Sequence, residues 1–259
     1  MTDNLVSVIL AAGAGTRLRP LTSFLPKALC PVDNVPLIDF ALGRAHRITD
    51  EIAVNVHHGR DVLERHLAGR AHISIEDREA LGTAGALGNL RGWIAGRDAL
   101  VLNADAWHRD DLSGFVAGWD RTRIRLLGVR DPERSDFGDL RYAGAALMPW
   151  KHIDPLAPDP SGLYEVSWRV AEKIGRLELI ESRVPFYDCG TIREYHGANM
   201  AASDGHNVIG AGAVVEGTIE RTVLWPNVHV WKMERLRDAI RPHDGVTISA
   251  RTNEVVDVG

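Results

Sequence analysis

Residues 5–32 read LVSVILAAGAGTRLRPLTSFLPKALCPV, and the order of residue types in this stretch points to one kind of fold. An apolar strand runs into a loop of small residues, which is followed by Arg17 and, ten residues later, by Lys27. A loop with so few β-carbons lets main-chain N–H groups approach a polyphosphate closely. Lys27 is one of only four lysines in a chain rich in arginine, so we interpret it as a positioned charge. The stretch therefore predicts a loop that binds the phosphates of a nucleoside triphosphate.

Two better-known phosphate loops do not fit this stretch. The chain contains no G-x-x-x-x-G-K-[ST] string. The dinucleotide pattern G-x-G-x-x-G also fails, because residues 13–15 are followed by TRL and Pro20 blocks a long helix at that point. The remaining alternative is an ordinary strand-to-helix turn with an arginine on the surface.

The length, charge and cysteine content of the chain narrow its class. At 259 residues it can bury a substantial core, as one large domain or as a domain with a small appendage. A net charge of −5 leaves no basic excess to displace counterions, so we expect no nucleic-acid partner. Two cysteines make no disulfide framework, residues 1–4 contain no lysine or arginine ahead of the apolar segment 5–14, and no long apolar span follows. We therefore expect a cytoplasmic protein with no membrane partner.

Apolar runs of strand length alternate with helical patterns through the first half of the chain. This alternation predicts an α/β fold with a mostly parallel sheet and crossover helices. Ligands of such sheets lie outside the carboxyl ends of the strands, where the glycine loop and the corner at Asn103 and Asp105 both fall. The expected strands are 5–11, 51–56, 72–75, 99–103 and 124–129, and the expected helices are 37–46, 60–67, 83–90, 112–121 and 192–202.

Residues 10–31 match without a gap the opening motif L-A-[AG]-G-x-G-T-R-L-x-P-L-T, followed by P-K-x-L-x-P, of the sugar-1-phosphate nucleotidylyltransferases, also called NDP-sugar pyrophosphorylases. The resemblance continues intermittently to residue 203 and is closest to the mannose-1-phosphate guanylyltransferase and N-acetylmuramate-1-phosphate uridylyltransferase branches. It implies the Rossmann-like nucleotide-diphospho-sugar transferase fold, with Arg17 and Lys27 as catalytic residues. It also implies that the nucleotide is bound by Leu10, Ala11, Ala12, Gly13, Ala14, Gly15, Thr16 and Arg17.

Beyond residue 203 the pattern of apolar residues in the sequence changes. Apolar residues recur at intervals of six, apart from one step of ten: Val208, Val214, Leu224, Val230 and Leu236. The pattern resembles the hexapeptide left-handed β-helix that follows the catalytic domain in many members of the family. We therefore expect a nucleotidyltransferase catalytic domain at 1–203 and a short β-helix-like tail at 204–259. Repeat stacks need about three repeats to be stable alone, so we expect the tail to serve in packing or in a homo-oligomer rather than in a second activity.

Two aspartates are candidate metal ligands. Nucleotidyl transfer needs no protein nucleophile, but it needs a divalent ion and cationic donors around the leaving pyrophosphate. Mg²⁺ prefers one or two carboxylates, with phosphates and water completing its shell. Asp105 follows an apolar strand and resembles the family's first, catalytic magnesium ligand, while Asp188 lies in FYDCGT, which resembles the [WFY]-x-D-x-G-T motif that supplies the second. The alternative for a lone aspartate is a helix N-cap or a turn.

The string LGTAGAL at residues 81–87 resembles the L-G-T-A-G segment that closes over the base, especially in the guanylyltransferase branch. The resemblance implies nucleotide contacts for Glu79, Gly82 and Thr83, with Glu79 accepting hydrogen bonds from guanine. The alternative for Glu79 is a solvated charge before a helix. Residues 55–59, NVHHG, resemble the N-x-H-H loop of the two closest branches. We expect these histidines to be structural, because no third zinc ligand lies at a suitable spacing.

The sugar side departs from the family pattern. Residues 136–139, DFGD, run almost directly into YAGA at 142–145, so the hairpin with the E-K-P segment is missing, and with it the Glu-Lys pair that contacts sugar and phosphate in relatives. Residues 162–166, GLYEV, stand where relatives have a G-x-x-E-[IV] stretch that lines the sugar site. Trp168 is either an apolar wall of the site or part of the core. The candidate substrate-binding residues are Lys27, Asn103, Gly138, Gly144, Glu165 and Arg169.

The motifs together predict transfer of a nucleotidyl group from a nucleoside triphosphate to a sugar-1-phosphate, giving an NDP-sugar and pyrophosphate, with Mg²⁺ as cofactor. Guanylyl transfer to a mannose- or heptose-type 1-phosphate is the first expectation, and uridylyl transfer is the second. Two alternatives stay open. One is a cytidylyl-type enzyme that uses a non-sugar phosphate such as phosphocholine, and the other is a non-catalytic regulatory subunit that binds a sugar nucleotide. The missing hairpin favours the regulatory subunit, whereas the two aspartates and Lys27 disfavour it.

Overall fold

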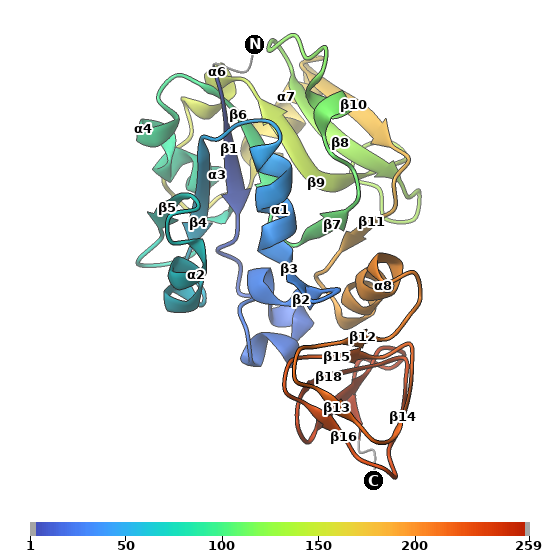
Figure 1. Cartoon of the computed structure of the whole chain (residues 1–259). Coiled ribbons are helices and arrows are strands. Elements are labelled where there is room, and N and C mark those ends of the chain that lie inside the picture. Colours follow the sequence, from blue (N-terminus) through green and yellow to red (C-terminus); the bar gives the residue numbers. More distant parts are fainter. Residues whose placement is uncertain (1–3, 257–259) are drawn as a thin grey trace. The chain divides into compact units, whose positions relative to one another are not determined.

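The computed structural model describes residues 4–256 (Figure 1). Contacts divide the chain into two compact units. The sheet unit comprises the residues up to Ala14 together with Ile38–Phe186, and the tail unit comprises Gly15–Leu37 together with the residues from Tyr187 onward. The division between a catalytic domain and a tail at residue 203 stays a prediction.

A seven-stranded sheet forms the centre of the sheet unit, and β1 is its dark-blue arrow in Figure 1. Every neighbouring pair is parallel except the two pairs that involve β9. The expected α/β fold with a mostly parallel sheet is therefore confirmed. In spatial order the strands are β10 (Leu177–Ser182), β8 (Ile124–Arg130), β9 (Leu140–Met148), β6 (Asp98–Asn103), β1 (Leu5–Leu10), β4 (Ile52–Val56) and β5 (His72–Ile75).

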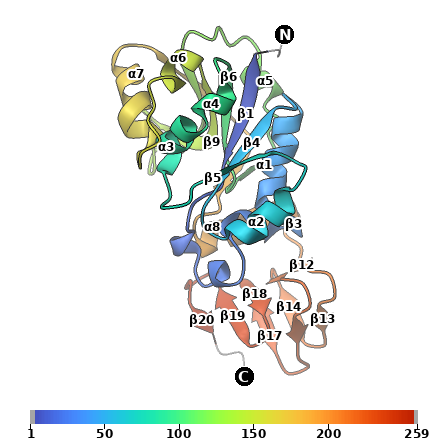
Figure 2. The same cartoon turned by 90° about the vertical axis from the view of Figure 1, so that its left-hand side faces the viewer.

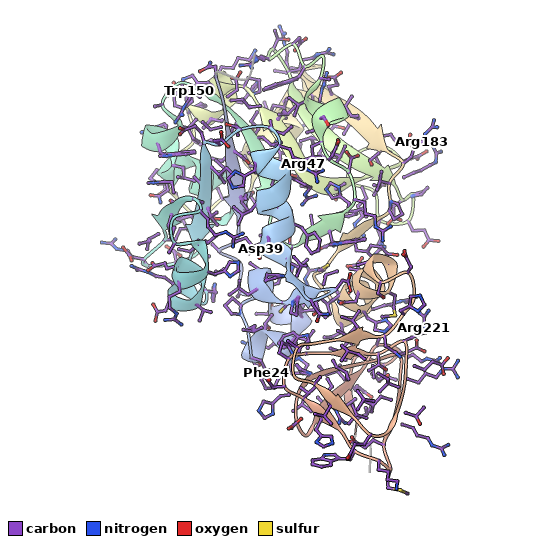
Figure 3. All side chains as sticks on the ribbon, viewed as in Figure 1. Phe24, Asp39, Arg47, Trp150, Arg183 and Arg221 are labelled. Atoms are coloured by element: carbon purple, nitrogen blue, oxygen red, sulfur yellow. The ribbon has the colours of Figure 1, made fainter. Side chains whose placement is uncertain are left out.

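Helices connect and cover these strands. One large apolar core packs β1, β6, β8 and β9 against two groups of helices. The first group lies between β5 and β6 in the chain, and the second lies between β9 and β10. Asp39 on α1, labelled in Figure 3, accepts a hydrogen bond from His66 Nε2 of α2 at 2.8 Å. The helices and the short strand are α1 (Leu37–His46), α2 (Arg60–Leu67), α3 (Gly82–Asn89), α4 (Arg91–Ile94), β7 (Ala106–His108), α5 (Ser113–Val116), α6 (Trp150–Ile153), a π-helical turn (Tyr164–Trp168) and α7 (Arg169–Lys173).

The helix expected at 112–121 is wrong. Only α5 forms there, because Leu112, Gly118 and Arg121 all adopt positive φ angles, of 63°, 66° and 59°. A right-handed helix cannot continue through such residues. Asp111 Oδ1 instead accepts hydrogen bonds from Ser113 N and Oγ at the start of α5.

The tail unit begins with three short 3₁₀ turns and a hairpin that pack on one long helix. Tyr195 Oη of that helix donates to Pro31 O, and Asn199 Oδ1 accepts from Asp33 N at 3.0 Å. Thr191 caps the helix by accepting from Glu194 N. The turns are Thr16–Leu18, Leu21–Ser23 and Lys27–Leu29, the hairpin is β2 (Pro31–Val32) with β3 (Val35–Pro36), and the helix is α8 (Ile192–Ala202), which follows β11 (Phe186–Asp188).

Short parallel strand pairs stack into coils in the rest of the tail unit, which confirms the expected β-helix-like tail (Figure 2). Its core contains Leu224, Val230 and Leu236, as expected, whereas Val214 is 49% exposed and lies outside it. The coils and the terminal hairpins are formed by β12 (Val208–Ile209), β13 (Val214–Val215), β14 (Thr218–Glu220), β15 (Val223–Leu224), β16 (His229–Val230), β17 (Arg235–Arg237), β18 (Ala239–His243), β19 (Val246–Ser249) and β20 (Val255–Val256).

None of the helices in residues 4–256 combines the length and the apolar character that a membrane crossing requires.

Candidate active site

The loop after β1 presents main-chain N–H groups to its surroundings. Ala11 and Ala12 are buried, while Gly13 and Ala14 are exposed. Within the described part of the chain, the N–H groups of Gly13 and Ala14 make no hydrogen bond, and a β-carbon on Gly13 would meet no atom within 4 Å. The loop is thus open on the side from which a ligand could approach, as the sequence predicts for a phosphate loop.

The corner after β6 lies beside this loop. Ala104 N donates to Leu10 O at 3.0 Å, so the segment between Asn103 and Asp105 is tied to the carboxyl end of β1. Gly144 on β9 approaches the same corner so closely that a β-carbon there would collide with Ala106 and lie 3.4 Å from Asn103 Cβ. The structure therefore brings together Leu10, Asn103 and Gly144, three of the residues that the sequence singled out.

A buried amide at the end of β4 and a buried carboxylate connect two loops at this edge of the sheet. Asn55 Oδ1 accepts from Ala11 N at 2.8 Å, and Asn55 Nδ2 donates to Glu76 Oε1 at 2.7 Å. Glu76 Oε2 accepts from Leu81 N at 2.8 Å, and the residue is 3% exposed. The loop after β1, the carboxyl end of β4 and the loop after β5 are thus held in one network. Sequence reasoning missed Glu76, although a carboxylate directly after an expected strand was a signal that could have found it.

The two histidines of the N-x-H-H string are structural, as expected. His58 Nδ1 donates to Ala12 O at 3.0 Å, and His57 Nδ1 donates to Glu76 O at 2.5 Å. Their rings lie edge to face, with centroids 4.6 Å apart. Both side chains therefore fix the backbone of the loops around the site.

The segment expected to close over the base begins α3. Gly82 has φ +71°, and a β-carbon there would lie 2.5 Å from Ser161 O. Thr83 Oγ1 accepts from Leu163 N at 2.8 Å, so both residues make contacts within the protein. Glu79 is exposed in the loop before the helix. Nucleotide contacts of Glu79, Gly82 and Thr83 stay a prediction.

The residues expected on the sugar side are dispersed. Gly138, with φ +58°, occupies a tight turn in which Leu140 N donates to Phe137 O at 2.9 Å. Glu165 and Arg169 are exposed on the π-helical turn and at the start of α7, and no hydrogen bond or ion pair in residues 4–256 connects them to Asn103 or Gly144. Trp168, at 6% exposed, belongs to the core.

The buried cation Arg44, which sequence reasoning missed, holds β7, the strand that begins directly after Asp105. Arg44 of α1 donates to Ala106 O at 3.0 Å and forms a second hydrogen bond with His108 Nε2. Burial lowers the pKa of Arg44 to about 10, so it remains charged at neutral pH. Burial and then the Arg44 charge lower the pKa of His108 to about 2, so this ring is neutral. Burial, and secondarily the Asp105 charge, raise the pKa of the Tyr142 phenol, which stays protonated.

In the tail unit, Gly15 places Lys27. Gly15 has φ +63°, and a β-carbon there would lie 2.8 Å from Thr22 Cγ2 and 2.9 Å from Lys27 Cβ. Thr22 Oγ1 donates to Gly15 O at 3.0 Å, which fixes the turn. Nearby, burial raises the pKa of the Cys30 thiol to about 12 against the opposing influence of Lys27, so Cys30 is not a thiolate.

Three charged groups of the tail unit converge around Gly190. A β-carbon at this position would lie 3.0 Å from Asp188 Oδ1, 3.2 Å from Arg17 Nη2 and 3.4 Å from Lys27 Nζ. The sequence motifs that contain these residues are separated by more than 150 residues, and the fold of this unit brings them together. Two cations beside one carboxylate form a site suited to phosphate groups.

Two carboxylates are the predicted ligands of a divalent cation, and this assignment stays a prediction. Asp105 in the sheet unit and Asp188 in the tail unit are the two carboxylates that the sequence assigned to a metal. In residues 4–256 no group of three or more histidine, cysteine, aspartate or glutamate side chains is placed to hold a metal ion by itself. Mg²⁺ needs no such cage, because it takes one or two carboxylates and completes its shell with substrate phosphates and water.

A comparison with known protein families matches residues 6–140 to the family described as nucleotidyl transferase. The N-acetylmuramate alpha-1-phosphate uridylyltransferase of Caulobacter vibrioides is 33% identical over 171 residues, which cover 59% of this chain and 71% of that protein. The bifunctional protein GlmU of Methanococcus aeolicus is 33% identical over 133 residues, or 51% of this chain and 32% of its own length. A solved structure from Thermus thermophilus, named mannose-1-phosphate geranyltransferase, aligns with a TM-score of 0.70 at 17% identity and covers 92% of this chain and 91% of that one.

These likenesses differ in what they show. The solved structure is distant in sequence and supports the fold alone, and the chain spans about a third of GlmU. The family match covers more than half of the chain and includes the loop after β1, the network around Glu76 and the corner at Asp105. The chain therefore belongs to the nucleotidyl transferase family of enzymes.

Proposed function

We propose that this protein transfers a nucleotidyl group from a nucleoside triphosphate to a sugar-1-phosphate and releases pyrophosphate. The observation that carries the proposal is the convergence of Arg17, Lys27 and Asp188 around Gly190. Two cations and one carboxylate in this arrangement can hold phosphate oxygens on one side and share a divalent ion with them on the other.

In the reaction, an oxygen of the sugar-1-phosphate attacks the α-phosphorus of the triphosphate. The bond from that phosphorus to the β-phosphate oxygen breaks, and pyrophosphate leaves with the electron pair. No side chain needs to act as a nucleophile, so the contribution of the protein is positioning and charge stabilisation. The N–H groups of Gly13 and Ala14 bind phosphate oxygens, Arg17 stabilises the charge that builds on the leaving group, and Lys27 binds the sugar phosphate or the α-phosphate.

Asp105 and Asp188 would hold Mg²⁺. The ion, when bound, neutralises negative charge on the reacting phosphates. Arg44 supports Asp105 indirectly, because its hydrogen bonds to Ala106 and His108 fix β7, the strand that begins directly after Asp105. An enzyme family of this kind generally depends on a divalent cation, commonly Mg²⁺.

Two bases are candidates for the nucleotide. Glu79, exposed in the loop before α3, favours guanine, because its carboxylate could accept hydrogen bonds from the N1–H and the amino group of that base. The name of the Caulobacter relative favours uracil. For the sugar we propose a mannose- or heptose-type 1-phosphate with guanylyl transfer, or an amino-sugar 1-phosphate with uridylyl transfer.

A pyrophosphate-release screen tests the proposal. The common nucleoside triphosphates are each paired with a panel of sugar-1-phosphates and with phosphocholine, in the presence of Mg²⁺. Turnover with a sugar-1-phosphate is the expected result. Turnover with phosphocholine and CTP alone would instead make the protein a cytidylyl-type enzyme. No turnover with any pair, together with tight binding of a finished sugar nucleotide, would make it a regulatory subunit.

A further inference from the structure

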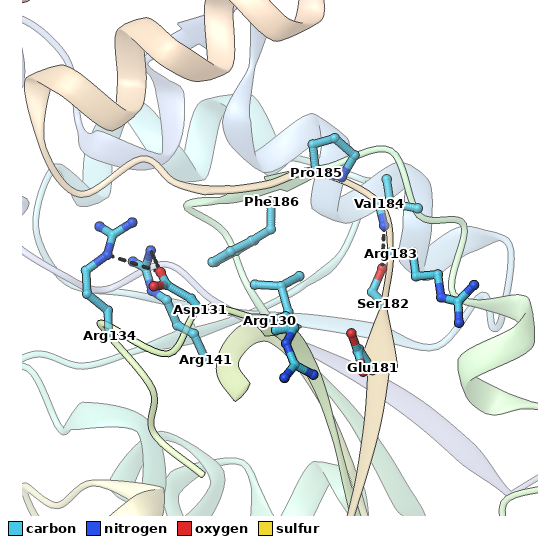
Figure 4. A pocket seen from close by; sticks show the side chains of 11 residues that line it. Arg130, Asp131, Arg134, Arg141, Glu181, Ser182, Arg183, Val184, Pro185 and Phe186 are labelled. Atoms are coloured by element: carbon cyan, nitrogen blue, oxygen red, sulfur yellow. Dashed lines mark hydrogen bonds and ion pairs between the residues drawn. The ribbon is translucent and has the colours of Figure 1, made fainter. Parts of the chain in front are cut away.

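The chain leaves the sheet unit at Phe186, in the lining of a pocket of about 340 Å³ at the carboxyl ends of β8 and β10 (Figure 4). The next residue, Tyr187, belongs to the tail unit and packs on α8. The packing is close, because a β-carbon on Gly197 of that helix would lie 2.9 Å from Tyr187 Cε1. The helix therefore holds the segment that carries Asp188.

The same helix holds the segment that carries Lys27. Tyr195 Oη of α8 donates a hydrogen bond to Pro31 O. Cys30 N donates to Lys27 O at 3.1 Å, so the turn that contains the lysine closes directly before Pro31. Lys27 and Asp188, which converge around one glycine, thus come from two segments that are both fixed to α8.

The coils of the tail unit hold the Tyr195 hydroxyl. Trp225 Nε1, directly after β15, donates to Tyr195 Oη at 3.0 Å. Tyr195 is 0% exposed and Trp225 is 3% exposed, so water does not compete for these hydrogen bonds. Burial raises the pKa of the Tyr195 phenol well above its ordinary value, so the hydroxyl stays protonated and donates to Pro31 O. Tyr195 therefore links the coils to the segment that carries Lys27.

Two further contacts join the coils to this segment. The Phe24 ring, labelled in Figure 3, stacks on the ring of His243 of β18, with centroids 5.7 Å apart. Asn34 Nδ2 donates to Ile209 O of β12 at 3.1 Å. Phe24 precedes Lys27 and Asn34 follows it, so the coils contact the segment on both sides of the lysine.

We propose that Tyr195 is a positioning residue for the transfer reaction, through which the coils set Lys27 against Asp188. The inference rests on the proposed function and gives the tail a part in it. Lys27 contacts phosphate oxygens, whereas Tyr195 acts only through the backbone at Pro31. A displacement of about 1 Å in a group that must meet a reacting phosphate can lower the rate about a hundredfold. A tail that served only in packing or in a homo-oligomer would have no such effect.

Tyr195→Phe tests the inference, because it deletes the hydroxyl and keeps the ring. We expect kcat to fall about tenfold to a hundredfold. The KM for the triphosphate should change by less than about threefold, because the N–H groups of Gly13 and Ala14, which receive its phosphates, lie in the sheet unit. Trp225→Phe removes only the donor to Tyr195, so it should lower kcat in the same direction by about threefold to tenfold. It also decides the matter if Tyr195→Phe does not fold.

Thr222→Val is the matched control. Thr222 is fully buried in the same coils, and its Oγ1 donates to Glu220 O at 3.0 Å. This variant also deletes one buried hydroxyl, but the hydroxyl contacts only the coils. Urea denaturation should show that Thr222→Val and Tyr195→Phe are destabilised to a similar extent. Thr222→Val should nevertheless keep the kcat of the wild type.

Hydrogen exchange supplies a readout that does not depend on turnover. The amide of Cys30 closes the turn that carries Lys27. It should exchange at least about tenfold faster in Tyr195→Phe than in the wild type, because the turn loses its link to α8. In Thr222→Val its exchange should match that of the wild type.

The possible results separate this inference from the proposed function. Wild-type kcat in Tyr195→Phe would overturn the inference and leave the proposed function standing. An equal loss of kcat in Tyr195→Phe and Thr222→Val would also overturn it, because destabilised coils would then explain both. A raised KM with unchanged kcat would assign Tyr195 to substrate binding and refute a role in positioning Lys27. No turnover of any sugar-1-phosphate by the wild type would overturn both proposals.

Discussion

Two glycines of the loop after β1 are expected to respond in opposite ways to the same substitution. Gly15 adopts φ +63°, and a β-carbon there would lie 2.8 Å from Thr22 Cγ2 and 2.9 Å from Lys27 Cβ. Gly13 has no positive φ, and a β-carbon there would meet no atom within 4 Å. Gly15→Ala should therefore perturb the fold, whereas Gly13→Ala should perturb only what approaches the loop from outside.

The structure gives the size of each effect. Left-handed backbone costs alanine about 1–2 kcal/mol, and displacing two packed side chains costs about 1–3 kcal/mol, so Gly15→Ala should lower the free energy of unfolding by roughly 2–5 kcal/mol. Gly13→Ala should raise it by about 0.4–1 kcal/mol, because alanine restricts the unfolded chain. Its methyl group nevertheless stands where phosphates would approach, so kcat/KM for the triphosphate should fall about tenfold to a hundredfold, or about 1.4–2.7 kcal/mol.

Urea denaturation followed by tryptophan fluorescence measures the first quantity, and pyrophosphate release at varied triphosphate concentration measures the second. Gly43→Ala is the matched control, because a β-carbon on this exposed glycine of α1 would also meet no atom within 4 Å. It should be stable and fully active. A Gly13→Ala variant with the kcat/KM of the wild type would show that the phosphates do not approach this loop. A Gly15→Ala variant as stable as the wild type would refute the packing argument.

The remaining predictions concern single side chains. Lys27→Ala should lower kcat about a hundredfold with its fold intact, because one preorganised donor lowers the activation barrier by about 3 kcal/mol. Single-turnover kinetics would measure this loss. EDTA should abolish the reaction, and Asp105→Asn or Asp188→Asn should raise the Mg²⁺ concentration for half-maximal rate at least about tenfold. Glu76→Gln turns an amide N–H toward a donor, so urea denaturation should show a loss of about 1–3 kcal/mol. The pKa of His108 in the folded protein is lowered to about 2, so only the unfolded state protonates this ring as the pH falls below ~6.5. From pH 7 to pH 5 the wild type should therefore lose about 2 kcal/mol more stability than His108→Gln.

Each of these predictions can fail cleanly. Near wild-type turnover of Lys27→Ala at saturating substrate would remove the lysine from the mechanism. Unchanged metal dependence in either aspartate variant would reassign that carboxylate, and Asp111→Asn, at the exposed start of α5, is the control that should behave like the wild type. Equal acid sensitivity of His108→Gln and the wild type would mean that the buried ring accepts a proton in the folded protein.

The expected strands and the longer helices were predictable because their residue patterns are local. The expected helices 37–46, 60–67 and 192–202 coincide with α1, α2 and α8, and each of the five expected strands has a counterpart within one residue at each end. An amphipathic helix buries one apolar stripe and a central strand buries both faces, regardless of which elements pack against them. The helix at 112–121 failed because three residues there adopt positive φ, and composition alone does not reveal that choice.

Candidate site residues could be named from the sequence where a motif is continuous. The charged residues that meet at Gly190 came from two such motifs, one at each end of the catalytic region. Glu76 and Arg44 were missed because their partners lie 21 and 64 residues away, and pairing at that distance leaves no periodic signal in one sequence.

The hydrogen bonds of Asn55 and Glu76 have a consequence for how this enzyme could change its base preference over evolutionary time. Glu76 and Leu81 are clamped to each other, so the four residues between them form a short loop with fixed ends. Residues 77–79 are exposed, and their side chains can be exchanged without straining the frame beneath them. If Glu79 contacts the base as proposed, a new nucleobase specificity can arise at the tip of this loop, while Ala11 and the backbone of the loop after β1 stay where they are.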